Sequence, residues 1–148
     1  MLKVLIAEDE LLIADQIEET LVACGYHVCG IARTVDEGVT LGEMHKPDLA
    51  VLDLRLAQGD NGADIARRLN SRANFGVLYA TGNDQPDSAL SIEVGDALIR
   101  KPFRADELAQ ALAIVWEIAT AGTATLPFPK GFRLLPRPAT QLVLGFPA

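Results

Sequence analysis

Five side chains near the ends of predicted strands could together carry out phosphoryl transfer. Glu8 and Asp9 follow the first apolar run of the chain, and Asp53 lies near the end of the third. Three carboxylates held close together stay ionised only beside a cation, and an all-oxygen cluster of this kind suits Mg²⁺. Thr81 adds a hydroxyl and Lys101 a positive charge, which together with backbone N–H groups make a pocket for an oxyanion. A carboxylate can itself attack phosphorus, so the sequence predicts Asp53 as the nucleophile.

The elements that must position these side chains alternate between two hydrophobic patterns. Short continuous apolar runs are typical of buried strands, and apolar residues at helical spacing indicate amphipathic helices. The runs predict strands at 3–7, 26–32, 48–54, 75–80 and 96–100, and helices at 11–24, 34–46, 62–71, 86–95 and 105–121. Such alternation implies an α/β fold with a parallel sheet covered on both faces, and the flavodoxin-like strand order 2-1-3-4-5 is the commonest solution. In that order strands one and three are neighbours, which would bring the acids together.

The last part of the chain has a different composition. Residues 122–148 contain five of the eight prolines, no acid and nine large apolar residues, which excludes an ordinary helix and an inert linker. We therefore divide the chain into a domain at 1–121 and a C-terminal extension at 122–148. The extension is expected to cover a surface of its own domain or of a second copy, and a homodimer with the extension in the contact is the favoured alternative.

Composition narrows the classes of function. A net charge of −7 argues against a nucleic-acid or anionic-membrane surface, and no apolar run approaches the ~20 residues that a membrane span needs. Acids appear within the first eight residues, too soon for a signal peptide, so we expect a cytoplasmic protein. The spacing of Cys24 and Cys29 matches no zinc pattern.

Residues 1–120 resemble the receiver domain of two-component response regulators. The matching stretches are VLIAEDE, PDLAVLDLRLAQGDNG, LYATG and LIRKPF. The resemblance implies that Asp53 is the phosphoacceptor, that Glu8 and Asp9 form the acid pair, and that Asp9 is the more direct Mg²⁺ ligand. It also implies that the backbone carbonyl of Arg55 is a further ligand.

The resemblance also assigns the switch residues. Thr81 would move its hydroxyl to the phosphoryl oxygen, and Lys101 would pair with the phosphoryl group, with a cis bond to Pro102. Receivers commonly have Tyr or Phe three residues before the lysine, but this chain has Leu98.

The stretch LYATGND resembles the phenylalanine-alanine-threonine-glycine signature of an atypical receiver subgroup in bacterial general-stress signalling. Gly82, Asn83 and the residues after them are therefore expected to be the mobile element. Arg55 and Asn83 stand at positions that tune loss of the phosphoryl group in receivers.

The leading interpretation is a stand-alone phosphoacceptor rather than an enzyme with a separate substrate. A sensor histidine kinase would supply the phosphoryl group, and the output would be a protein contact or phosphotransfer, because the extension is too short and proline-rich for a DNA-binding unit. One alternative is a haloacid-dehalogenase-like phosphatase, which needs a second acid two residues after the nucleophile, where this chain has Arg55. Another alternative is a degenerate receiver that acts only as an interaction module. The presence of all five side chains argues against it.

Overall fold

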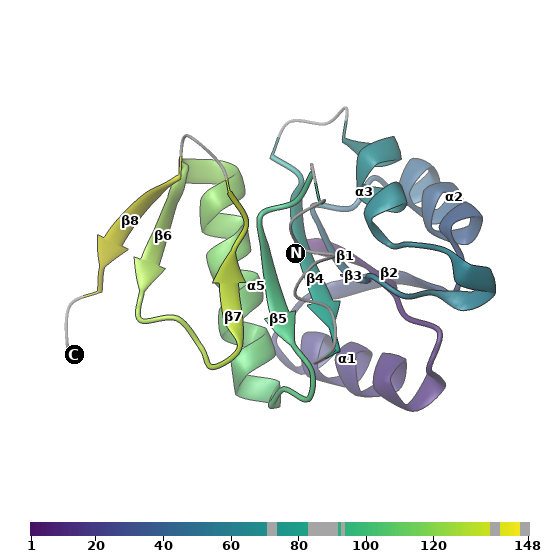
Figure 1. Ribbon diagram of the computed structural model, residues 1–148, viewed down its shortest axis with the longest axis horizontal. Coiled ribbons are helices and arrows are strands. Elements are labelled where there is room, and N and C mark those ends of the chain that lie inside the picture. Colours follow the sequence, from purple (N-terminus) through teal and green to yellow (C-terminus); the bar gives the residue numbers. More distant parts are fainter. Residues whose placement is uncertain (71–73, 83–91, 93, 137–139, 146–148) are drawn as a thin grey trace.

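The computed structural model describes residues 1–70, 74–82, 92, 94–136 and 140–145 (Figure 1). Helices lie on both faces of a central sheet, and two strands of the C-terminal extension form a separate sheet beyond one edge of it. The elements are β1 (Lys3–Ala7), α1 (Leu11–Ala23), β2 (His27–Ala32), α2 (Val35–His45), β3 (Leu49–Asp53), a 3-10 turn (Ala57–Gly59), α3 (Ala63–Leu69), β4 (Gly76–Thr81), β5 (Ala97–Arg100), α5 (Ala105–Ala121), β6 (Thr123–Leu126), β7 (Phe132–Leu134) and β8 (Gln141–Leu144). Most of the helix predicted at 86–95 lies outside the described residues.

The central sheet has the strand order β2-β1-β3-β4-β5-β7. Its first five strands are parallel, which confirms the predicted flavodoxin-like order, and β7 adds an antiparallel sixth strand that was not predicted. Every residue of β3 and β4 is buried, as expected for strands covered on both faces. The carboxyl ends of β1, β3, β4 and β5 therefore open onto one edge of the sheet.

Alternate residues of the strands point into two apolar cores, one on each face of the sheet. Leu5, Leu52 and Tyr79 pack with Ile65 of α3 on one face. On the other face, side chains of the intervening strand positions pack with Leu112 of α5. The period of two along each strand separates these cores, and the continuous apolar runs follow from the need to fill both.

The predicted start of the second helix is present in the structure. The Thr34 hydroxyl accepts a hydrogen bond from the backbone N–H of Glu37 at 3.2 Å, and the Glu37 carboxylate accepts one from the backbone N–H of Arg33 at 3.0 Å. Gly38 and Gly42 let this helix approach α3, because a Cβ atom on Gly38 would lie 2.4 Å from Ile65 Cδ1. This contact holds α3 beneath the end of β3.

The C-terminal extension forms strands, which its sequence pattern did not predict. Its prolines flank the strands instead of interrupting them, so the strands keep their backbone donors. β7 pairs with the edge of β5, and the following residue, Leu135, is buried beside Tyr79 and Leu98. β6 packs near α5 and pairs in parallel with β8. Part of the extension therefore covers its own domain. None of the helices in the described ranges is long and apolar enough to cross a membrane.

Candidate functional site

Three carboxylates meet where β1 and β3 end. Glu8 follows β1, and its backbone N–H donates to the carbonyl of Ala32 at 2.9 Å, while Asp53 is the last residue of β3. The β1–β3 register places Ala7 beside Leu52, so the next residues of both strands face the same space. Carboxylate oxygens of Glu8, Asp9 and Asp53 lie within 4.8 Å of one another. The parallel pairing of β1 with β3 is what brings residues 8 and 53 together.

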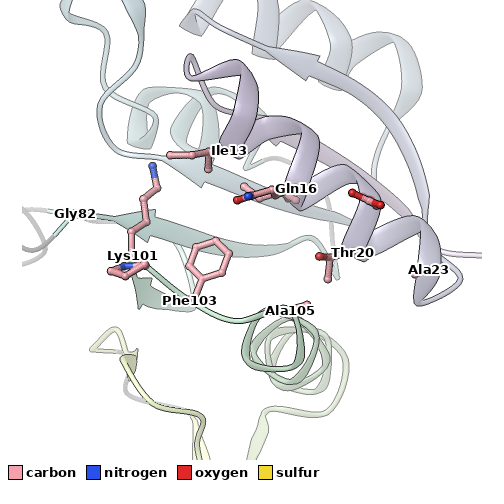
Figure 2. Close-up of a pocket in the computed structure, with 11 residues that line it drawn as sticks. Ile13, Gln16, Thr20, Ala23, Gly82, Lys101, Phe103 and Ala105 are labelled. Atoms are coloured by element: carbon pink, nitrogen blue, oxygen red, sulfur yellow. The ribbon is translucent and has the colours of Figure 1, made fainter.

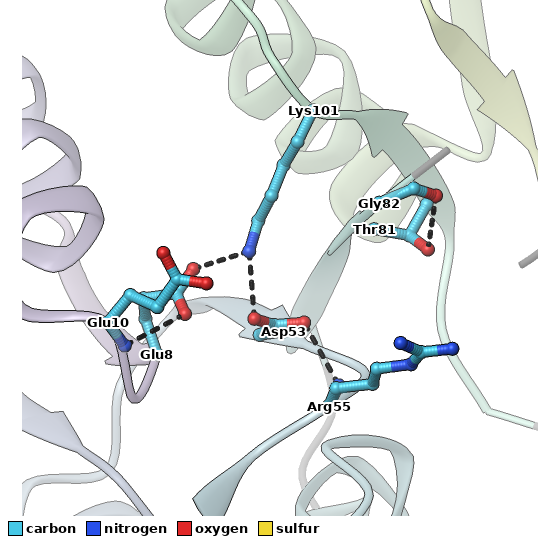
Figure 3. Close-up of polar contacts among 7 residues, drawn as sticks. All are labelled: Glu8, Glu10, Asp53, Arg55, Thr81, Gly82 and Lys101. Atoms are coloured by element: carbon cyan, nitrogen blue, oxygen red, sulfur yellow. Dashed lines mark hydrogen bonds and ion pairs between the residues drawn. The ribbon is translucent and has the colours of Figure 1, made fainter. Parts of the chain in front are cut away.

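Lys101 reaches the same point from the end of β5. Its Nζ donates to Glu8 Oε1 at 2.6 Å and to Asp53 Oδ2 at 2.8 Å (Figure 3). The backbone N–H of Lys101 donates to the carbonyl of Thr81 at 2.7 Å, and the peptide bond between Lys101 and Pro102 is cis. The ammonium group is thus held between two buried carboxylates, where it can also meet an oxyanion.

Burial and close contact change the pKa values of Glu8 and Lys101. Glu8 is only 1% exposed, and burial together with its hydrogen bond to Asp53 raises the pKa of its carboxyl to about 7, against the lowering effect of Lys101. Burial alone lowers the pKa of the Lys101 ammonium, but its hydrogen bonds to Asp53 and Glu8 raise the pKa above the ordinary value. Lys101 therefore keeps its proton in this environment.

Asp53 is held by backbone groups as well as by Lys101. Its Oδ1 accepts a hydrogen bond from the backbone N–H of Arg55 at 2.9 Å (Figure 3). The loop that follows is tied to the fold at Asp60, whose carboxylate accepts the backbone N–H of Val35 at 2.8 Å. Both oxygens of Asp53 thus face donors, which fixes the carboxylate at the strand end.

Gly62 is a site-supporting residue that sequence reasoning missed. A Cβ atom at this position would lie 2.0 Å from the carbonyl oxygen of Asp53, so only glycine allows the start of α3 to approach β3 this closely. The asparagine–glycine pair at 61–62 was visible as a loop signal, but nothing local shows that it touches Asp53. The contact exists only because β3 and α3 pack together.

Of the predicted switch residues, Thr81 and Gly82 lie across Asp53 from Glu8 (Figure 3), and Asn83 lies outside the described part of the chain. Thr81 is buried at the end of β4, and its hydroxyl donates to the carbonyl of Gly82 at 3.3 Å. Figure 3 shows these two residues across Asp53 from Glu8, with the Arg55 side chain directed toward their side. Asn83 lies outside the described residues, so its relation to Arg55 stays a prediction.

An open groove of about 850 Å³ lies next to Lys101 between α1 and α5 (Figure 2). Ile13, Gln16 and Thr20 line it from α1, and Phe103 lines it from the β5–α5 loop. Access to the site is therefore available beside the lysine.

Comparison with known proteins identifies the family. Residues 4–113 match the family model of the response regulator receiver domain. This chain is a member of that family.

Similar proteins agree with this assignment. The receiver is 34% identical over 114 residues to the transcriptional regulatory protein PdtaR of Mycobacterium tuberculosis, which covers 76% of this chain and 55% of PdtaR. The crystal structure of the response regulator PhyR from Brucella abortus matches 72% of this chain and 44% of that one, at 33% identity and a TM-score of 0.62. The receiver domain of a modulated diguanylate cyclase from Desulfovibrio desulfuricans G20 matches 79% of this chain and 94% of its own, at 26% identity and a TM-score of 0.69. The receiver spans about half the length of the curated relatives it matches first.

The receiver departs from the common pattern at Leu98. This side chain is 6% exposed and packs in the core that also contains Tyr79 and Leu135 of the extension. In the register Leu98 lies between Tyr79 of β4 and Arg133 of β7. A leucine enclosed on both sides cannot swing between solvent and core as an aromatic ring at a strand edge could.

Proposed function

We propose that this receiver accepts a phosphoryl group from a sensor histidine kinase on the carboxylate of Asp53. This proposal rests on one observation. Asp53 lies at the end of β3, where one carboxylate oxygen accepts a hydrogen bond from the backbone N–H of Arg55 and the other accepts one from Lys101 Nζ. A carboxylate oxygen forms the new P–O bond while the P–N bond of the phosphohistidine breaks, and the released imidazole takes up a proton.

The chemistry of the donor set fits Mg²⁺. The carboxylates of Glu8, Asp9 and Asp53 offer oxygen ligands within 4.8 Å of one another, and the backbone carbonyl of Arg55 is a further candidate. When bound there, Mg²⁺ supplies positive charge that neutralises the phosphoryl oxygens. Lys101 orients the carboxylate and provides a second positive charge beside it.

The phosphorylated state would be sensed through Thr81. Its hydroxyl, which donates to the carbonyl of Gly82 in this structure, would turn to a phosphoryl oxygen and draw residues 82–83 with it. Because Leu98 is enclosed by the core, we propose that this segment, and not a rotating ring, carries the signal. The phosphoryl group is then lost slowly by hydrolysis, so the protein acts as a signalling phosphoacceptor and not as an enzyme with its own substrate.

The output is proposed to be a contact with a downstream protein or a phosphotransfer partner, with no nucleic acid or membrane bound by this chain. The net charge of −7 supports this choice. A cytoplasmic location follows from the proposed kinase and agrees with two free cysteines. We also propose that residues 1–121 form the receiver domain, that residues 122–148 form an extension joined to it through the β5–β7 pairing, and that two copies associate through the extension.

Intact mass spectrometry after incubation with acetyl phosphate and Mg²⁺ tests the phosphoacceptor. The wild-type chain should gain one phosphoryl group, and Asp53→Asn should gain none. Asp36→Asn is the matched control, because Asp36 is an exposed acid far from the site in sequence and should leave the adduct unchanged. An adduct on Asp53→Asn, or none on the wild type with either acetyl phosphate or a phosphorylated histidine kinase, would refute the proposal.

A further inference from the structure

The outermost strand of the extension, β8, is an exposed apolar edge. Leu142, Val143 and Leu144 are 59%, 40% and 76% exposed, and β8 pairs with β6 only, among the strands that the structure describes. Figure 1 shows β8 on the far side of β6 from α5. Parallel strands are rarely stable unless both faces are covered, and a two-stranded sheet alone is marginal. β8 therefore resembles half of a larger sheet.

The other described strand edges carry features that prevent pairing, and β8 does not. The β1–β2 register skips Cys29, which makes a bulge in β2. The outer side of β6 is capped by Glu117, which accepts the backbone N–H of Thr125 at 3.0 Å. β7 has only three residues, contains Arg133 and lies close to prolines on both sides. By contrast, β8 has the sequence QLVL, with neither charge nor proline.

The free backbone groups of β8 can be assigned from its pairing with β6. The backbone N–H groups of Gln141 and Gly145 donate to the carbonyls of Gly122 and Leu126, each at 2.9 Å. Since strand residues alternate in direction, Val143 also faces β6, and Leu142 and Leu144 direct their N–H and C=O groups to the open edge.

We infer that β8 pairs antiparallel with β8 of a second copy, which makes a four-stranded sheet β6-β8-β8-β6 across a two-fold axis. In the register centred on Val143, Leu142 of each copy lies opposite Leu144 of the other. These pairs use the outward N–H and C=O groups on both sides, and they place four leucines on one face of the sheet. Backbone hydrogen bonding and leucine packing thus favour the same register. This register is self-complementary, as a two-fold contact requires.

Charge permits a second copy as the occupant at this edge, and the self-complementary register selects it. The chain has a net charge of −7, so two copies repel each other over most of their surfaces. β8 itself carries no charged residue, so two copies can meet along it without like charges facing each other. A four-residue strand buries less than the ~800 Å² per partner of a stable interface, so the dimer should dissociate on dilution. The contact is remote from Asp53 and does not depend on phosphorylation there.

Sedimentation velocity over a series of protein concentrations tests association at β8. The wild type and Asp53→Asn should both shift from monomer to dimer as concentration rises. Leu144→Lys should remain monomeric, because it sets a charge against Leu142 of the other copy. Met44→Lys is the matched control, since Met44 of α2 is 68% exposed and the substitution adds the same charge. It should dimerise like the wild type.

Two further variants test the register. Leu142→Glu should be monomeric alone, and an equal mixture with Leu144→Lys should dimerise, because the register places the new Lys opposite the new Glu and restores one leucine pair. Val143→Cys in a Cys24→Ser background should form a disulfide-linked dimer on mild oxidation, because the two Val143 positions face each other at about 4.5 Å between Cα atoms. A wild type that is monomeric at every concentration would refute the pairing. So would a Leu144→Lys variant that associates as well as Met44→Lys.

Discussion

Replacement of Gly62 by alanine should damage the site without touching any charged group. A Cβ atom at this position would lie 2.0 Å from the carbonyl oxygen of Asp53, whereas such contacts are essentially never below 3.0 Å. The backbone of Gly62 has φ −58° and ψ −24°, which alanine adopts freely, so the whole cost is steric. The end of β3 and the start of α3 must therefore separate by about 1 Å. Overpacking of this kind costs about 1–3 kcal/mol of unfolding free energy.

The same movement displaces the phosphoacceptor relative to its partners. The Asp53 carboxylate is aligned by the backbone N–H of Arg55 and by Lys101, and a misplacement of about 1 Å at a reacting group can cost about 100-fold in rate. We expect Gly62→Ala to be phosphorylated by acetyl phosphate at least tenfold more slowly than the wild type, in the presence of Mg²⁺. Urea unfolding and a mass-spectrometric time course measure the two effects separately.

Gly25→Ala separates lost stability from lost geometry. Gly25 has φ +91°, and a Cβ atom added there would meet nothing within 4 Å, so alanine is strained by about 1 kcal/mol but lies away from the site. This variant should be destabilised and yet phosphorylated at the wild-type rate. Equal phosphorylation rates for Gly62→Ala and Gly25→Ala would refute the argument that the close contact positions Asp53.

Three further predictions follow from other contacts. Saturating Mg²⁺ should stabilise the wild type, by about 2.7 kcal/mol at a hundredfold excess over the dissociation constant, and thermal unfolding should show less stabilisation for Asp9→Asn; an equal gain would exclude Asp9 as a ligand. Leu135→Ala should lower the unfolding free energy by about 2–4 kcal/mol in urea, because Leu135 is buried beside Tyr79, whereas the exposed Leu142→Ala should change it little. The pKa of Glu117 is lowered because hydrogen bonds from Thr123 and Thr125 outweigh the opposing effect of burial, so Glu117→Ala should cost about 1 kcal/mol at neutral pH. Because the pKa of Glu117 is lower in the folded than in the unfolded state, its ionised carboxylate stabilises the fold above pH 4.5, and this stabilisation is lost on acidification. In urea unfolding, the difference in unfolding free energy between the wild type and Glu117→Ala should therefore shrink below that pH. A difference that does not change with pH would contradict this.

The extension shows where local sequence patterns stop being informative. Its prolines and the absence of acids were enough to separate it from a helix or a linker, but they carried no strand period. β7 exists because β5 offers an edge for it, and Leu135 is buried because Tyr79 and Leu98 leave space for it. Both are long-range contacts, so their contribution to stability cannot be read from a short stretch of sequence. The sequence showed that Leu98 replaces the aromatic residue common in receivers, but not that residues of the extension enclose it.

The sequence by itself was enough to predict which side chains meet at the strand ends and the order of the central strands. Buried parallel strands need continuous apolar runs, and the side chains that follow each run must emerge at the same edge of the sheet, so the types and spacing of Glu8, Asp53 and Lys101 were sufficient to predict their meeting. Only the tertiary structure decided that Gly62 lies against Asp53 and that β8, among the described strands, pairs on one side alone. The physical reason is that steric exclusion and edge pairing depend on which distant segments pack together, and this is settled by the whole chain.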